Sequence, residues 1–239
     1  MAQMGLLQVV GGLISVVFAV CHILNKDPFG LATIALTIVT SVIRTEGLFN
    51  FLLAFNRFVI MCRLRCPKYA FSPLNCSVWA FFALHVALFL TPFAGYEAVP
   101  GVLVVVLDNS RPYSEVFTKI GGYIYEFSLV CSLATYVIIA AYILHLRSKT
   151  KTVNNFQREG KILLYAGIRF AIDGIQTVLF HYAPFPEHPV VMFMYSLSYS
   201  INLTIVPPVL YLVLYSNTRQ EFFARSKSSV FVVRYNYIS

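Results

Sequence analysis

Residues 31–55 read LATIALTIVTSVIRTEGLFNFLLAF, an apolar stretch long enough to cross a lipid bilayer. A hydrocarbon core about 30 Å thick is crossed by roughly 20 helical residues, each rising about 1.5 Å. The 239-residue chain contains five further stretches of this kind, at residues 5–24, 77–93, 121–146, 162–182 and 190–215. The sequence therefore predicts an all-α fold, a polytopic transmembrane bundle of six spans that forms a single domain over residues 1–239.

The loops between these stretches alternate in charge. The loop after residues 31–55 has four cations and no acidic residue, and the loop after residues 121–146 has five cations against one acidic residue. The tail at residues 216–239 is also basic. Because Lys and Arg beside membrane spans are retained on the cytoplasmic side, we expect these segments, and with them both termini, to be cytoplasmic.

Composition agrees with a membrane protein and argues against other classes. The chain is 58% hydrophobic and 12% charged, whereas about a quarter of the residues in soluble domains are charged. The net charge of +8 is explained by cations at the membrane edge, which attract anionic lipid. Membrane lipid is therefore an expected partner, and nucleic acid is not.

Motifs for catalysis or metal binding are not evident in the sequence. The chain has no G-x-S-x-G element, no glycine-rich phosphate loop and no H-E-x-x-H spacing, so we expect neither an enzyme nor a cofactor. Cys62 and Cys66 have a C-x3-C spacing, but no second Cys or His pair accompanies them, so a metal site is not expected. The five cysteines include no extracellular pair that could form a disulfide.

Polar side chains inside the stretch 31–55 occupy two sides of the predicted helix. At 100° per residue, Glu46, Asn50 and Arg57 fall within about 40° of one another, whereas Arg44 lies on nearly the opposite side with three threonines. Polar groups are costly in lipid and face the interior of a bundle. A helix with polar groups on both sides must be covered all round, so we expect it at the centre of the bundle.

Other stretches carry polar stripes, which fit either hydrogen bonds between helices or a ligand cavity. These stripes consist of Tyr125, Ser128, Ser132 and Thr135; Tyr165, Arg169, Asp173 and Gln176; and Tyr195, Tyr199 and Asn202. The candidates for a ligand pocket are Arg44, Glu46, Tyr125, Glu126, Asp173, Gln176 and Tyr199.

A buried ion pair between the second and fifth spans is expected, because a lone charge at this depth is costly. Arg44 lies about 20 Å from Arg57 along its helix, and Asp173 lies about 18 Å from Lys161 along its own. These similar depths predict an Arg44–Asp173 pair, whereas Glu46 and Arg169 match less well. An alternative is that Arg169 neutralises Asp173 one turn away on the same helix.

Three short elements resemble those of known receptors. Asn56-Arg57-Phe58 resembles the end of the third helix in rhodopsin-like seven-helix receptors, and residues 207–211, PPVLY, resemble their seventh-helix Pro-x-x-Tyr element. With the Pro184-Phe185-Pro186 turn, they are similar to nematode chemoreceptors of serpentine receptor class T. The resemblance implies a plasma-membrane receptor for chemoreception that binds a small-molecule ligand from outside and activates a heterotrimeric G protein inside. It assigns G-protein contact to Asn56 and Arg57, and a switch role to Pro208 and Tyr211.

The chain departs from the receptor pattern in several places. The stretch 5–24 corresponds to the second helix of the family, so the first helix is expected to be missing and the chain to be truncated. Asn56 replaces an acidic residue, Pro207 replaces an asparagine, and the loop at residues 94–120 has no cysteine for the disulfide that pins it in many receptors. A small transporter or channel, and a non-functional receptor remnant, are the alternative interpretations.

Overall fold

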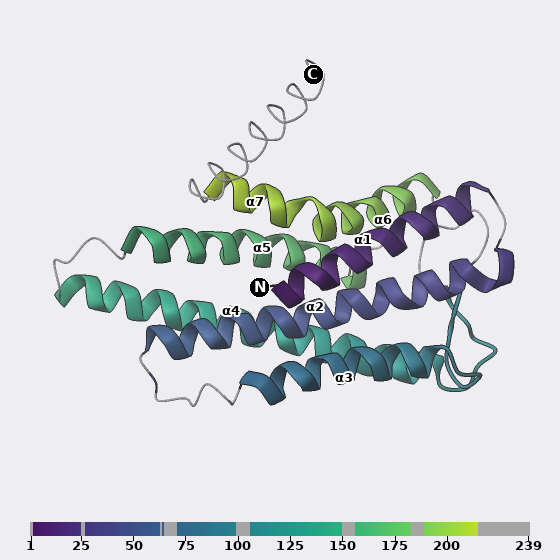
Figure 1. Ribbon diagram of the computed structural model, residues 1–239, viewed down its shortest axis with the longest axis horizontal. Coiled ribbons are helices and arrows are strands. Elements are labelled where there is room, and N and C mark those ends of the chain that lie inside the picture. Colours follow the sequence, from purple (N-terminus) through teal and green to yellow (C-terminus); the bar gives the residue numbers. More distant parts are fainter. Residues whose placement is uncertain are drawn as a thin grey trace, which may run out of the picture.

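The computed structural model describes residues 2–24, 27–62, 64, 71–98, 106–149, 156–182 and 189–214. It is a bundle of long helices with a short hairpin at one end (Figure 1). The Pro184-Phe185-Pro186 turn, the basic tail at 216–239 and the loop cations Arg63, Arg65 and Lys68 lie outside the described residues.

Each of the six predicted stretches forms helix. The helices are α1 (Ala2–Ile23), α2 (Leu31–Met61), α3 (Phe71–Phe89), α4 (Ser114–Lys149), α5 (Phe156–Tyr182), α6 (Pro189–Thr204) and α7 (Val206–Leu214), with a short 3₁₀ turn η1 (Pro28–Gly30) before α2. Helix α3 begins six residues before the predicted span and ends four residues before its predicted end. The last predicted span is divided between α6 and α7, which meet at an angle of 44°.

In the described part of the chain, four helices are long and apolar enough to cross a membrane, or five if α6 and α7 together form one span. The four are α1, α2, α3 and α4. Their exposed side chains are largely aliphatic, as in α1, where Leu6, Val9, Leu13 and Val16 are each more than half exposed. An apolar exterior of this kind is suited to lipid rather than to water.

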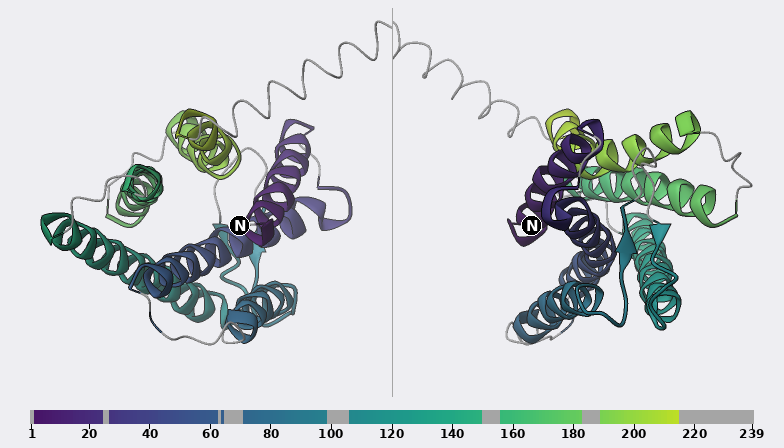
Figure 2. Two further views of the ribbon diagram at one scale, coloured as in Figure 1. Left: turned by 60° about the vertical axis from the view of Figure 1, so that its left-hand side comes forward. Right: turned by 90° about the vertical axis from the view of Figure 1, so that its right-hand side faces the viewer.

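Helix α2 lies at the centre of the bundle, as its two polar sides predicted. It packs against α1, α3, α4 and the hairpin strand β1 (Tyr96–Glu97), and two rotated views show its neighbours on different sides of it (Figure 2). In its most apolar stretch 56% of the residues are buried, against 11 to 22% in α1, α3 and α4. The central position of α2 therefore accommodates polar side chains that lipid would not.

Glycines allow the close approach of α2 to its neighbours. A Cβ atom on Gly47 would lie 2.6 Å from Cδ2 of Tyr125 in α4, and one on Gly11 of α1 would lie 2.8 Å from both Val42 and Leu203. Small residues commonly allow membrane helices to approach closely. The Gly47 contact is important for the site described below, because it seats the Tyr125 ring directly against α2.

A two-stranded hairpin covers the end of the bundle between α3 and α4, a detail that the predicted all-α fold did not include. Strand β1 pairs antiparallel with β2 (Val106–Leu107). Tyr96 is 1% exposed and stacks on Phe89 of α3, with ring centroids 4.6 Å apart. Arg111 donates hydrogen bonds to the carbonyl oxygens of Thr91 and Ala94 at 2.7 and 2.9 Å. Aromatic stacking and arginine contacts therefore hold the loop without a disulfide.

The bend between α6 and α7 lies directly before Pro207 and Pro208. Neither proline has a backbone N–H, so the carbonyl oxygens of Leu203 and Thr204, four residues earlier, receive no helical bond from them. Proline is nevertheless favoured at the start of a helix, and here α7 begins at Val206. The predicted proline kink is thus confirmed as a change in helix direction at Ile205.

Candidate functional site

A buried ion pair joins α2 to α5. Nη2 of Arg169 donates a hydrogen bond to Oε1 of Glu46 at 2.6 Å. Nη1 of Arg169 also bonds to Asn202 of α6, through the side-chain oxygen at 2.7 Å and through the backbone carbonyl oxygen. Within α5, Nε of Arg169 lies 3.6 Å from Oδ2 of Asp173. One guanidinium therefore contacts groups on three helices.

Amide side chains extend this cluster to a fourth helix. Gln8 of α1 donates a hydrogen bond to Oε1 of Glu46 at 2.8 Å. The amide nitrogen of Asn202 donates to Oδ1 of Asp173 and to Oε1 of Gln176, each at 2.7 Å. Charged groups in a low-dielectric interior need such partners, because an unpaired ion there is strongly unfavourable. The cluster of Gln8, Glu46, Arg169, Asp173, Gln176 and Asn202, called here the buried ionic cluster, links α1, α2, α5 and α6.

Burial makes the charge balance of this cluster important. Glu46, Arg169 and Asp173 are 7%, 4% and 8% exposed. Two carboxylates thus share one guanidinium, and each carboxyl group would have to be neutralised or paired at a depth where ions are costly. The stronger contact of Arg169 is with Glu46, since the distance to Asp173 exceeds that of a normal hydrogen bond.

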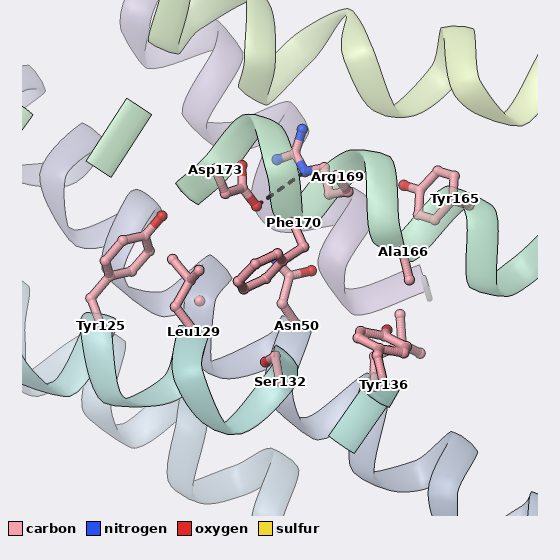
Figure 3. A pocket seen from close by; sticks show the side chains of 12 residues that line it. Asn50, Tyr125, Leu129, Ser132, Tyr136, Tyr165, Ala166, Arg169, Phe170 and Asp173 are labelled. Atoms are coloured by element: carbon pink, nitrogen blue, oxygen red, sulfur yellow. Dashed lines mark ion pairs between the residues drawn. The ribbon is translucent and has the colours of Figure 1, made fainter. Parts of the chain in front are cut away.

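A cavity of about 40 Å³ lies beside the cluster, between α2, α4 and α5 (Figure 3). At about 10–15 Å³ for each water-sized group, it has room for roughly three. Its lining is mixed, with apolar Leu129 and Phe170 beside polar or charged groups. The polar and charged members are Asn50, Tyr125, Ser132, Tyr136, Tyr165, Arg169 and Asp173. A small polar molecule, or several waters, could therefore occupy this space.

The structure brings together only part of the predicted ligand pocket. Tyr125 and Asp173 line the cavity, and Glu46 and Gln176 belong to the buried ionic cluster. Glu126 and Tyr199 are half-buried, and neither is among the residues that line the cavity. Of the seven predicted candidates, the cavity and the cluster thus include four, and Arg44 lies outside them as well.

Arg44 belongs to a separate polar cluster on the other side of α2, so the predicted Arg44–Asp173 ion pair is wrong. Its guanidinium bonds to Nε2 of His85 in α3 and to the carbonyl oxygen of Thr118 in α4, the latter at 3.2 Å. It also lies 5.8 Å from the ring centroid of Phe89. Depth alone suggested the pair, but Arg44 and Glu46 differ by about 200° around the helix, and that rotation turns Arg44 away from α5.

The hydrogen bonds around Arg44 fix the protonation of His85. Ser41 donates its hydroxyl proton to the carbonyl oxygen of Thr37 at 2.7 Å, so it accepts the bond from Nδ1 of His85, also 2.7 Å long. Because the guanidinium of Arg44 can only donate, Nε2 of His85 accepts. His85 is therefore neutral with its proton on Nδ1, and Arg44 is the charged member of this cluster.

The predicted G-protein contacts lie at the far end of α2 from the hairpin. Asn56 and Arg57 are half-buried in its last turns. Nε of Arg57 is buried and has no hydrogen-bond partner among the described residues. Pro208 is exposed in α7. Tyr211 is in the same helix, but its side chain is not among those that the structure describes.

Sequence reasoning left three members of the cluster out of its site prediction. Arg169 and Asn202 belong to the polar stripes of the sequence, but the similar depths of Arg44 and Asp173 favour a different ion pair. Gln8 is not among the predicted residues. The signal for Gln8 was an uncharged amide within the apolar stretch 5–24, since polar side chains in a span tend to seek partners on other helices.

Comparison with known proteins gives no further assignment. No protein-family model, no curated protein and no solved structure matches the chain. The likeness to serpentine receptors of class T therefore rests on the three sequence elements alone.

Proposed function

We propose that the chain is a chemosensory-type G-protein-coupled receptor that binds a small ligand in the cavity between α2, α4 and α5. The observation that carries this proposal is the contact of Arg169 with both Glu46 and Asn202. This contact places a cavity-lining residue in direct connection with α2 and with α6. The Asn-Arg and Pro-x-x-Tyr elements of the sequence support the same conclusion.

The geometry suggests how a conformational change caused by ligand binding would be transmitted to the other end of the bundle. Asn202 contacts Arg169 and Asp173, both of which line the cavity. It lies three residues before the break at Ile205, where α6 turns into α7. A ligand that binds one arrangement of Asp173 and Asn202 more tightly than another would therefore shift the population of bend angles. Arg57 lies about 17 Å from Glu46 along α2 and would contact the G protein.

We further propose that α5 crosses the membrane as a sixth span, with α6 and α7 together forming another. In this arrangement the mid-helix charges of α5, Arg169 and Asp173, are buried in the bundle. The exposed positions of α5 include Leu164, Ile175 and Val178. The basic loops then lie in the cytoplasm with both termini, and the hairpin lies outside the cell. The plasma membrane is the location that a chemoreceptor requires.

The test of the receptor proposal is guanine-nucleotide exchange. The full chain is reconstituted in lipid nanodiscs with heterotrimeric G proteins of several subtypes, and nucleotide exchange is measured for the wild type, for Arg57→Ala and for Lys161→Ala. We expect the wild type to accelerate exchange on one subtype, and Arg57→Ala to abolish that acceleration at an unchanged protein level. Lys161 is an exposed cation at the start of α5 and serves as the matched control. The receptor proposal fails if no subtype responds, or if Arg57→Ala exchanges as fast as the wild type.

A small transporter is the second candidate, because a cavity beside buried ions is also what a substrate pathway requires. The two functions are distinguished by measuring substrate flux. A transporter moves its substrate across sealed vesicles in the absence of any G protein, whereas a receptor does not. Flux of a substrate that is abolished by Asp173→Asn would favour the transporter.

A further inference from the structure

We propose that the cavity binds a protonated amine and that Asp173 is the counter-ion of the ammonium group. The proposal rests on the proposed receptor function, since it names the chemical class of ligand for the same cavity. It is argued from the charge balance of the buried ionic cluster, from the position of Asp173 in the cavity wall and from the chemistry of the other lining residues.

The buried ionic cluster has one carboxylate more than it has cations. Arg169 directs Nη2 to Glu46 at 2.6 Å and Nη1 to Asn202, which leaves Nε at 3.6 Å from Asp173. Among the described residues, the one hydrogen bond that the carboxylate of Asp173 accepts comes from the neutral amide of Asn202, on Oδ1. Asp173 is 8% exposed, and a carboxylate at that depth requires a positive partner. Arg169 is the one cation of the cluster, and it has to balance Glu46 as well as Asp173.

Arg44, the half-buried cation near the middle of α2, does not supply that partner. Arg44 lies on the opposite side of the helix, where it bonds to His85 and to the Thr118 carbonyl oxygen. A methyl group on Gly121 would overlap its guanidinium, so Arg44 is closely packed against α4 and cannot turn freely toward α5. The cavity that Asp173 lines is therefore the space from which a second cation could balance the cluster.

The cavity wall has the groups that recognise an ammonium ion. Figure 3 shows the hydroxyl end of Tyr125 turned toward Asp173, with Asn50, Ser132 and Phe170 also around the space. The oxygens of Asn50 and Ser132 can accept N–H bonds, and aromatic faces attract cations. Because the cluster has two carboxylates and one guanidinium, an anion would add to its negative charge, and a neutral molecule would leave the excess carboxylate unbalanced. At about 40 Å³, the space fits a small primary ammonium group better than a bulky quaternary one.

The experiment uses ethylammonium chloride as the probe. The full chain in nanodiscs, without any G protein, is unfolded thermally at constant ionic strength with increasing ethylammonium chloride, and with sodium chloride, acetamide or potassium acetate in parallel. Ligand that binds only the folded protein raises the unfolding midpoint with concentration. We expect ethylammonium to raise the midpoint with half-saturation in the millimolar range, as suits so small a ligand, and the other three compounds to have no comparable effect.

Two variants locate the binding site. Asp173→Asn removes the counter-ion and should weaken the ethylammonium effect at least about tenfold. Ser132→Met fills the cavity from α4 without changing any charge and should abolish the effect, which keeps the test decisive if Asp173→Asn does not fold. Glu115→Gln is the matched control, because it removes an exposed carboxylate at the start of α4 that pairs with Lys119. It should leave the ethylammonium effect unchanged.

Several results would overturn the proposal. An equal effect of sodium would mean a site for inorganic cations, and the absence of any cation effect would mean that a proton neutralises Asp173. An unchanged response in Asp173→Asn or Ser132→Met would place the amine elsewhere. Because no G protein is present, ethylammonium binding without nucleotide exchange contradicts the receptor proposal alone, whereas exchange without ethylammonium binding contradicts the amine proposal alone.

Discussion

Arg169 and Glu46 are 123 residues apart in the sequence, and a hydrogen bond of 2.6 Å joins their side chains. Both groups are buried, at 4% and 7% exposure. Removing one partner of a buried pair costs about 3–5 kcal/mol, although the net contribution of the pair to stability is smaller. The pair therefore matters chiefly for the orientation of α5: it defines which side of α5 faces α2, and with it the position of Asp173 in the cavity wall.

The first prediction concerns the crossing of α5. Lys151→Cys and Glu187→Cys, each in an otherwise cysteine-free chain, place one thiol on either side of this helix. We expect a membrane-impermeant thiol reagent to label Glu187→Cys in intact cells, and to label Lys151→Cys only after permeabilisation, because charge bias places the basic loop inside. Labelling of both thiols from the same side would show that α5 does not cross.

The second prediction concerns the contact between α2 and α4. Gly47→Ala would bring its Cβ to 2.6 Å from the Tyr125 ring, so the ring must move, at a cost of about 1–3 kcal/mol. Gly122→Ala, in α4, has no atom within 4 Å of its new Cβ and should gain up to about 1 kcal/mol from helix propensity. Thermal unfolding in nanodiscs compares the two variants. Equal stability of both would mean that Tyr125 is not seated against Gly47.

The third prediction concerns the pH dependence of the loop beyond the hairpin. The pKa of Asp108 is lowered by the hydrogen bond from the Ser110 hydroxyl, with further contributions from the Ser110 backbone N–H and from Arg111. A lowered pKa in the folded state stabilises the fold above the ordinary pKa of Asp, and this contribution is lost as the pH falls through the lowered value. We therefore expect the unfolding midpoint of the wild type to fall more steeply than that of Asp108→Asn between about pH 5 and pH 3. Glu97→Gln, on the exposed side of β1, is the control. Parallel curves of unfolding midpoint against pH for the wild type and Asp108→Asn would contradict the role of Asp108.

The helices and the central position of α2 could be predicted from sequence because hydrophobic length and helical periodicity are local properties. Residues 31–55 alone contain polar groups on two sides, and this pattern requires neighbours all round. The bend before Pro207 was predictable for the same reason, since proline acts on the backbone within four residues. The hairpin was missed because its two strands have only two residues each, and their pairing depends on Tyr96 stacking on Phe89 across a turn.

The partners inside the bundle were less predictable than the helices. Depth along a helix follows from counting residues, and it placed Arg44 and Asp173 at similar levels. The rotation of α5 about its own axis and its position around α2 do not follow from counting, and they pair Arg169 with Glu46 instead. Asn202 and Gln8 join the cluster from helices far away in the sequence, which periodicity within one helix cannot reveal.

The final prediction concerns the buried pair itself, which is tested by two double-mutant cycles. One cycle combines Glu46→Gln with Arg169→Gln, and the other combines Arg44→Gln with Asp173→Asn as the matched control. Each set of variants is compared by the free energy of unfolding in nanodiscs. Residues in direct contact show coupling energies of about 0.5–3 kcal/mol, whereas residues without shared partners are additive within about 0.5 kcal/mol.

The bundle described here predicts coupling of at least about 1 kcal/mol between Glu46 and Arg169, because either single substitution leaves a buried charge without its partner. It predicts additive effects, within about 0.5 kcal/mol, for Arg44 and Asp173, which lie in separate clusters. The reverse result, with additive effects at Glu46 and Arg169 and strong coupling between Arg44 and Asp173, would contradict the orientation of α5 toward α2 that the Glu46–Arg169 pair defines.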